Sequence, residues 1–126
     1  MRIDAAKRLG EAFETFAMSN CKPEVTGLPN SIFIWIEIGG DQVAHGPRIK
    51  VSNVRGKFRK EDTFSVSIPT RANQKPAVVF GEPKDFTPAE MRAIFTWVTI
   101  NQTALVEIWR SDTMDDTDAR KLLKKI

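Results

Sequence analysis

Apolar side chains alternate with polar ones in several short segments of the chain's first two thirds. Alternation with a period of two is typical of strands, because successive side chains point to opposite faces of a sheet. One segment, 32–38, is apolar on nearly both faces, which predicts a central strand covered on each side. The pattern therefore predicts a twisted antiparallel sheet of about four strands, at residues 32–38, 48–52, 63–68 and 77–80.

Apolar residues at helical spacing lie before and after this sheet. Residues 3–19 predict an N-terminal helix. The sequence at 87–90 is a capping box, with Pro88 at the first helical position, and predicts a long helix from there. Asn101 interrupts the apolar stripe, so we expect a bend or a buried, satisfied polar side chain. Aspartates followed by cations predict a short final helix from about Met114 to the C-terminus.

These elements fit a single α+β domain, a sheet packed with an N-terminal helix, a long helix after Pro88 and a short C-terminal helix. A length of 126 residues suits one domain, and the 41% hydrophobic and 28% charged fractions are those of a globular protein. No window approaches the roughly 20 apolar residues of a membrane span, and no signal-peptide pattern opens the chain. Cys21 is the only cysteine. The absence of a possible internal disulfide favours a reducing compartment, so we expect a cytoplasmic protein.

Positive charge is concentrated in one segment, residues 48–60. This segment holds six basic side chains and no acidic one, whereas the rest of the chain holds 13 basic and 16 acidic side chains. Localised basic charge indicates a surface for an acidic partner. The expected binding residues are Arg48, Lys50, Arg55, Lys57, Arg59 and Lys60.

The spacing of these cations predicts a geometry. Arg55, Lys57 and Arg59 alternate, so an extended backbone would place them on one face of a hairpin, with Phe58 opposite. Such cations would contact successive phosphates, and their reversal to Glu would weaken binding with little change in stability. The alternative is that they protect a sheet edge from pairing with another sheet. The sequence leaves both interpretations open.

Candidate catalytic residues are few. His45 is the only histidine, and Asp41 lies just before it. With Glu37 and Arg48 these residues form the alternative hypothesis, a small nuclease or toxin with an imidazole or carboxylate base and a cationic phosphate clamp. The simpler interpretation is that His45 is an exposed turn residue. The chain has no Cys or His pair, and its aspartates at 112–118 lack the pattern of a calcium loop, so we expect no metal and no cofactor.

Residues four apart on the predicted long helix carry a resemblance. The helix start and the residues that follow it are Phe86, Thr87, Pro88, Glu90, Trp97, Asn101, Leu105 and Trp109, and the strand before them holds Pro47, Ile49 and Val51. Over residues 31–110 this arrangement is similar to a family of small bacterial α+β domains of unknown function. That family has a strand motif Pro-Pro-His-x-His-Val and a gene context like that of toxin–antitoxin systems. Here Arg48 and Lys50 stand where that family has histidines.

Together these observations predict a non-enzymatic binding module that presents a basic β-hairpin to an acidic partner. That partner is a nucleic acid, a nucleoprotein or an acidic protein surface, and no membrane partner is expected. The resemblance implies a setting such as a toxin–antitoxin-type pair or an inhibitor from a phage or mobile element. The oligomeric state does not follow from the sequence.

Overall fold

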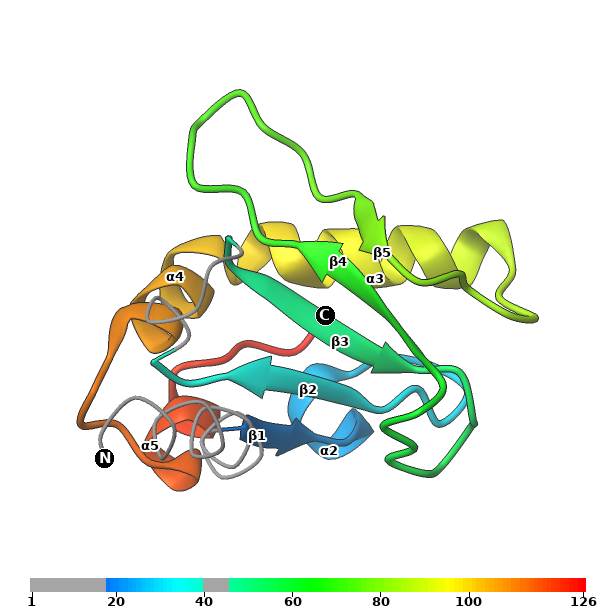
Figure 1. The fold of residues 1–126 in the computed structure, drawn as a ribbon, viewed down its shortest axis with the longest axis horizontal. Helices are drawn as coiled ribbons and strands as arrows, with labels where there is room; N and C mark the ends of the chain where they lie inside the picture. The colour runs from blue at the N-terminus through cyan, green and yellow to red at the C-terminus, as the bar shows by residue number, and fades with distance from the viewer. Residues whose placement is uncertain (1–17, 40–45) are drawn as a thin grey trace, which may run out of the picture.

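A five-stranded antiparallel sheet forms the centre of the computed structural model, which describes residues 18–39 and 46–126 (Figure 1). The strands lie in the sheet in the order in which they follow one another in the chain. They are β1 (Met18–Cys21), β2 (Ile34–Glu37), β3 (Arg48–Ser52), β4 (Thr63–Ser67) and β5 (Val78–Phe80). The α+β class and the strands predicted within 32–80 are therefore confirmed, with small shifts at their ends.

Three of the four described helices follow the sheet in the chain, and the fourth lies between β1 and β2. They are α2 (Pro23–Thr26), α3 (Pro88–Ile100), α4 (Gln102–Arg110) and α5 (Asp116–Lys121). The predicted capping box is present at the start of α3: the Thr87 hydroxyl accepts the Glu90 N–H at 3.1 Å, and the Glu90 carboxylate accepts the Thr87 N–H at 2.8 Å. The C-terminal helix is confirmed but is shorter than expected. Asp115 caps it, in agreement with aspartates at a helix start.

Strand β1 and helix α2 were not predicted. Residues 18 and 19 were expected to end an N-terminal helix, but Met18 and Ser19 pair with Glu37 and Ile36 of β2. Pairing with an adjacent strand outweighs the weak local preference of such a short segment. The rest of the helix predicted at 3–19 lies outside the described residues. The loop expected at 22–30 contains α2, which starts with Pro23 at its first position.

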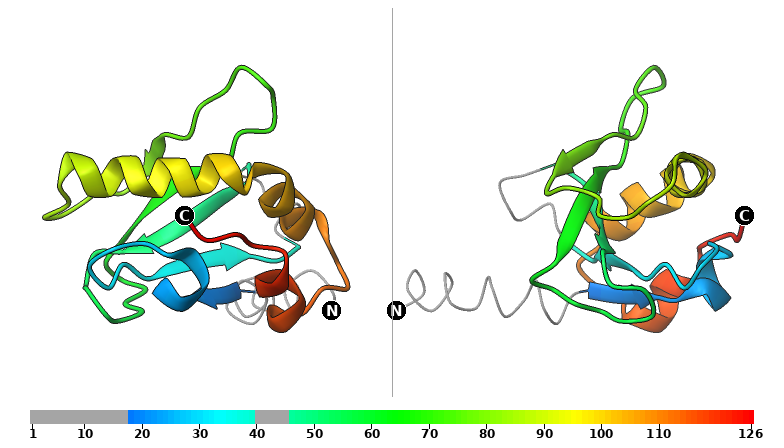
Figure 2. Two further views of the ribbon diagram at one scale, coloured as in Figure 1. Left: turned by 180° about the vertical axis from the view of Figure 1, so that it is seen from behind. Right: turned by 90° about the vertical axis from the view of Figure 1, so that its right-hand side faces the viewer.

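The hydrophobic core lies between one sheet face and the helices. Strands β2, β3 and β4 bury Ile34, Ile36, Ile49, Val51, Phe64 and Val66 on that face. Helices α3 and α4 cover it from one side (Figure 2), and Trp97 of α3 is fully buried there. Among the described residues, no helix has the length and apolarity that crossing a bilayer requires.

Asn101 separates α3 from α4 and is buried. Its side-chain Nδ2 donates to the carbonyl oxygens of Trp97 and Lys124, both at 3.0 Å. Its Oδ1 accepts the Lys124 N–H at 2.7 Å. The expectation of a satisfied polar side chain at this position is confirmed, and Asn101 holds the C-terminal segment against the junction of the two helices.

Candidate binding surface

The sheet face opposite the helices is rich in polar side chains. One row of cross-strand neighbours runs over all five strands: Asn20, Trp35, Lys50, Ser65 and Phe80. The neighbouring row contains Arg48, which pairs with Ser67. We call these two rows the polar sheet face. The described helices lie on the other side of the sheet (Figure 2).

Two of the predicted binding cations lie within this polar sheet face and have partners there. The Lys50 Nζ is 3.9 Å from the Glu37 carboxylate oxygen. The Arg48 guanidinium lies 5.7 Å from the centre of the Phe80 ring, which is a cation–π distance. Arg48 and Lys50 are therefore separated from the other four cations, because they lie along β3 and not in the connection that follows it.

The connection from β3 to β4, residues 53–62, is the segment that we call the basic loop. Most of it forms turns and bends and none of it is strand, so the predicted extended hairpin is wrong. Gly56 has a φ of 70°, a conformation that favours glycine, and it reverses the chain between Arg55 and Lys57. Two hydrogen bonds fix the loop: the Gly56 N–H donates to the Ser31 carbonyl, and the Asn53 N–H to the Asp62 carbonyl, both at 2.9 Å.

Arg55 is tied to the start of α3. Its Nη2 donates to the Glu90 carboxylate at 3.0 Å and to the Asp85 carbonyl at 2.9 Å. Its guanidinium lies 4.0 Å from the centre of the Phe86 ring. The expectation that Arg55 is a free surface cation, neutral for stability, is therefore wrong, because the charge is held by the fold.

Glu90 is the partner that organises this contact, and its side chain is buried. The Thr87 N–H, the Asn30 side-chain amide at 2.9 Å and Arg55 all donate to its carboxylate. These donors, the Thr87 N–H first, lower the pKa of Glu90 to about 2. The carboxylate thus joins the helix cap, the basic loop and the turn before β2.

Phe58 anchors the middle of the basic loop. Its ring centre lies 4.6 Å from that of Phe33 and 5.0 Å from that of Trp35. Lys22 places its ammonium 5.8 Å from the Phe33 ring centre, so a further cation stands beside this aromatic group. No local pattern indicates a role for Lys22, which is 36 residues from Phe58 in the chain.

The remaining cations of the basic loop point to solvent. Lys57 and Lys60 are exposed, and neither makes an ion pair with any described residue. Arg59 lies 3.5 Å from Glu61, with both side chains largely exposed. Asp62 faces Lys84 at 2.9 Å, and the hydrogen bond from Lys84 lowers the pKa of Asp62. The loop thus exposes the side chains of Lys57, Arg59 and Lys60 on a backbone that hydrogen bonds and ring contacts hold in place.

The alternative nuclease site is only partly described. His45 and Asp41 lie outside the described residues, so this hypothesis stays a prediction. Glu37 follows Ile36 on β2 and Arg48 precedes Ile49 on β3, so the antiparallel pairing of Ile36 with Ile49 makes Glu37 and Arg48 neighbours. A nucleophilic role for Cys21 is disfavoured, because burial raises the pKa of its thiol to about 12.

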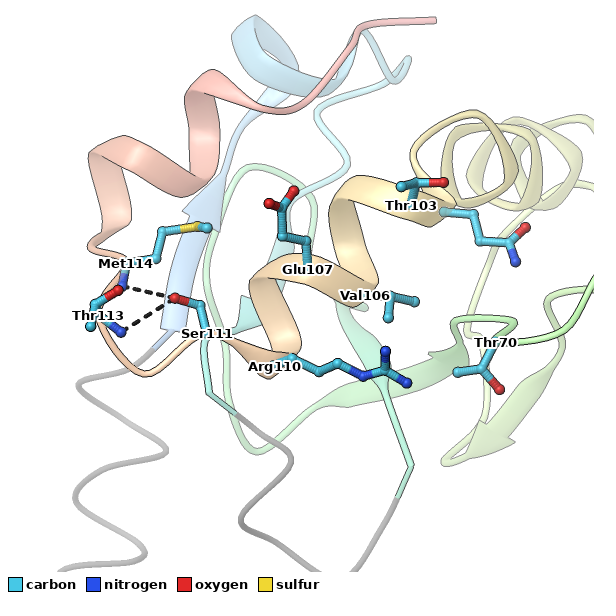
Figure 3. Close-up of a pocket in the computed structure, with 9 residues that line it drawn as sticks. Thr70, Thr103, Val106, Glu107, Arg110, Ser111, Thr113 and Met114 are labelled. Carbon is cyan, nitrogen blue, oxygen red and sulfur yellow. Dashed lines mark hydrogen bonds between the residues drawn. The ribbon is translucent and has the colours of Figure 1, made fainter.

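An open hollow of about 700 Å³ lies on the outer side of α4 (Figure 3). Its wall includes Val106 and Arg110 of α4 together with Thr70. At one end Ser111 is engaged locally, since its hydroxyl accepts the N–H groups of Thr113 and Met114 at 3.3 and 3.0 Å. The predicted binding cations do not line the hollow.

Comparisons with protein-family models, curated proteins and solved structures give no match to this chain.

Proposed function

We propose that this protein is a non-enzymatic binding module that holds an acidic macromolecular partner on the basic loop. The observation that carries the proposal is the contrast within the loop: its backbone is fixed by Arg55, Gly56 and Phe58, while Lys57, Arg59 and Lys60 reach solvent. A fixed loop loses little conformational freedom on binding, so its cations are available at low entropic cost.

Aromatic side chains add to the same region. Phe33 and Phe58 are half-buried beside Lys22, and Trp35 lies beneath them. Cations next to aromatic rings are typical of surfaces that bind single-stranded nucleic acid. The partner classes remain those of the sequence hypothesis, a nucleic acid, a nucleoprotein or an acidic protein surface. We place the module in the cytoplasm, in a setting such as a toxin–antitoxin-type pair or a phage or mobile-element inhibitor.

The test is a triple charge reversal of the exposed cations, Lys57→Glu, Arg59→Glu and Lys60→Glu. Arg55 is left intact because its reversal would break the contact with Glu90. Reversal of Lys121, Lys124 and Lys125 to Glu is the matched control, since these exposed lysines make the same change in net charge elsewhere on the surface. Circular dichroism and denaturation establish that both variants are folded.

Binding is measured with labelled single-stranded RNA, labelled duplex DNA and polyglutamate, and by capture from a lysate with and without nuclease. We expect the loop variant to lose about 3 kcal/mol or more, over about a hundredfold, while the control keeps most of its affinity. For a nucleic-acid partner, affinity falls steeply between about 50 and about 200 mM salt, and the loop variant shows a shallower slope. Full affinity in the folded loop variant would overturn the proposal.

A further inference from the structure

Strand β5 is an edge of the sheet with an unusual surface. In the described part of the chain no strand lies beyond it. Its three residues are all apolar and exposed, Val78 by 36%, Val79 by 53% and Phe80 by 65%. Edge strands of monomeric proteins are protected by charge, short length, proline or bulges, and β5, although short, carries no charge of its own.

The pairing of β5 with β4 leaves one residue unused. Ser65 pairs with Phe80, and the next residue, Val66, pairs with Val78. Val79 is therefore the extra residue of a bulge and has no partner on β4. Val79, at the centre of β5, is thus unpaired with β4 and is the second most exposed residue of the strand.

The segments before and after β5 carry charges of opposite sign. The loop before it carries Arg71 and Lys75, and the segment after it carries Glu82, Lys84 and Asp85. Lys84 is paired with Asp62 at 2.9 Å. The side chains of Arg71, Lys75 and Glu82 are exposed, and none of these three makes an ion pair with a described residue. The unpaired charges along this edge are therefore cationic before the apolar strand and anionic after it.

We propose that β5 is a self-association edge, and that its partner is β5 of a second copy of this chain in antiparallel register. A two-fold axis near Val79 brings the cationic end of each edge, at Lys75, to the anionic end of the other, at Glu82. Only the antiparallel arrangement achieves this complementarity, because a parallel copy would set like charges side by side. The joined sheet covers part of the exposed surface of these three side chains in both copies.

The flanking prolines limit this interface. Pro76 and Pro83 have no N–H to donate, so the shared ladder is confined to residues 77–82. A short ladder predicts a concentration-dependent dimer rather than a permanent one. The basic loop touches the segment after β5, because the Asn53 side-chain amide donates to the Glu82 carbonyl at 3.1 Å. The proposed contact uses the β5 edge and the Lys75 and Glu82 side chains, and not the exposed cations Lys57, Arg59 and Lys60, so the inference stands apart from the proposed function.

Sedimentation velocity of the full chain, from about 1 to about 300 μM, tests the inference. We expect a monomer–dimer equilibrium that Val79→Lys abolishes. Lys75→Glu weakens the dimer about tenfold or more, since symmetry counts each repulsive contact twice. Lys75→Glu combined with Glu82→Lys restores it, because the charges are exchanged and remain complementary.

The charge exchange is the decisive measurement, because both residues are exposed and neither variant disturbs the core. A chain that stays monomeric over the whole range overturns the inference, even if a foreign peptide later proves to bind β5. A dimer that survives Val79→Lys in the folded protein also overturns it, since the contact then lies elsewhere. If the double variant does not recover the affinity lost by Lys75→Glu, Lys75 and Glu82 do not face each other in the dimer, and the proposed arrangement is wrong.

Discussion

The basic loop contains two kinds of cation that the sequence does not distinguish. Arg55 is bound to Glu90, to the Asp85 carbonyl and to the face of Phe86. Lys57, two residues later, is exposed and makes no ion pair with any described residue. A run of positive charge can therefore contain both cations that are bound within the fold and cations that are exposed, and only the exposed ones are available to a partner.

The largest effect expected from this comparison is on stability, at Glu90. Glu90→Ala removes the acceptor of the helix cap and leaves the Arg55 guanidinium without its carboxylate. We expect the free energy of unfolding to fall by about 3 kcal/mol, measured by urea denaturation. The control is Glu61→Ala, which removes the exposed partner of Arg59 and changes stability by less than about 0.5 kcal/mol. Equal effects of the two substitutions would show that Glu90 is not an anchor.

The next effect is a dependence of stability on pH. The pKa of Glu90 is lowered from its ordinary 4.5 to about 2, so its ionised form stabilises the folded state. That contribution is complete above about pH 4.5 and is lost as the pH falls through about 2. The wild type should therefore lose stability more steeply in this window than Glu90→Gln, in which all other carboxylates still titrate. Parallel stability curves for the two proteins would contradict the assignment.

The smallest effect is expected at the exposed side of the loop. Lys57→Ala and Lys60→Ala, made singly, should each change the free energy of unfolding by less than about 0.5 kcal/mol. Each should nevertheless weaken binding of the labelled RNA, DNA or polyglutamate probe that the wild type prefers. A large loss of stability in either variant would mean that the exposed lysines, like Arg55, contribute to the fold.

Much of the fold follows from local patterns in the sequence. The strand at 48–52 and the helix start at Pro88 are placed correctly, because alternation and the capping box act over a few residues. Strand β1 is different, since Met18–Cys21 has no alternation of its own and is a strand only because β2 lies beside it. Such an element depends on a neighbour that is distant in the chain, so local reasoning misses it.

The candidate site likewise has features that local sequence patterns predict and features that depend on residues distant in the chain. Counting charges identifies the basic segment, and its binding role stays a prediction; Lys57 and Lys60 are its exposed cations without an ion pair to a described residue. The extended geometry was wrong because Gly56 turns the chain and because the partner of Arg55 lies 35 residues away. Glu90 was predicted only as a capping residue, and nothing local reveals that the same carboxylate also receives Arg55 and Asn30.

The shared carboxylate of Glu90 also has a consequence for the order of folding. It connects to Arg55 across 35 residues and to Asn30 across 60, so it closes two long loops at one point. Closing long loops is entropically unfavourable until other contacts have brought their ends together. We therefore infer that this junction forms after the β3–β4 hairpin and α3. Contacts that form late chiefly slow unfolding, so Glu90 governs how long the loop stays in place once it is made.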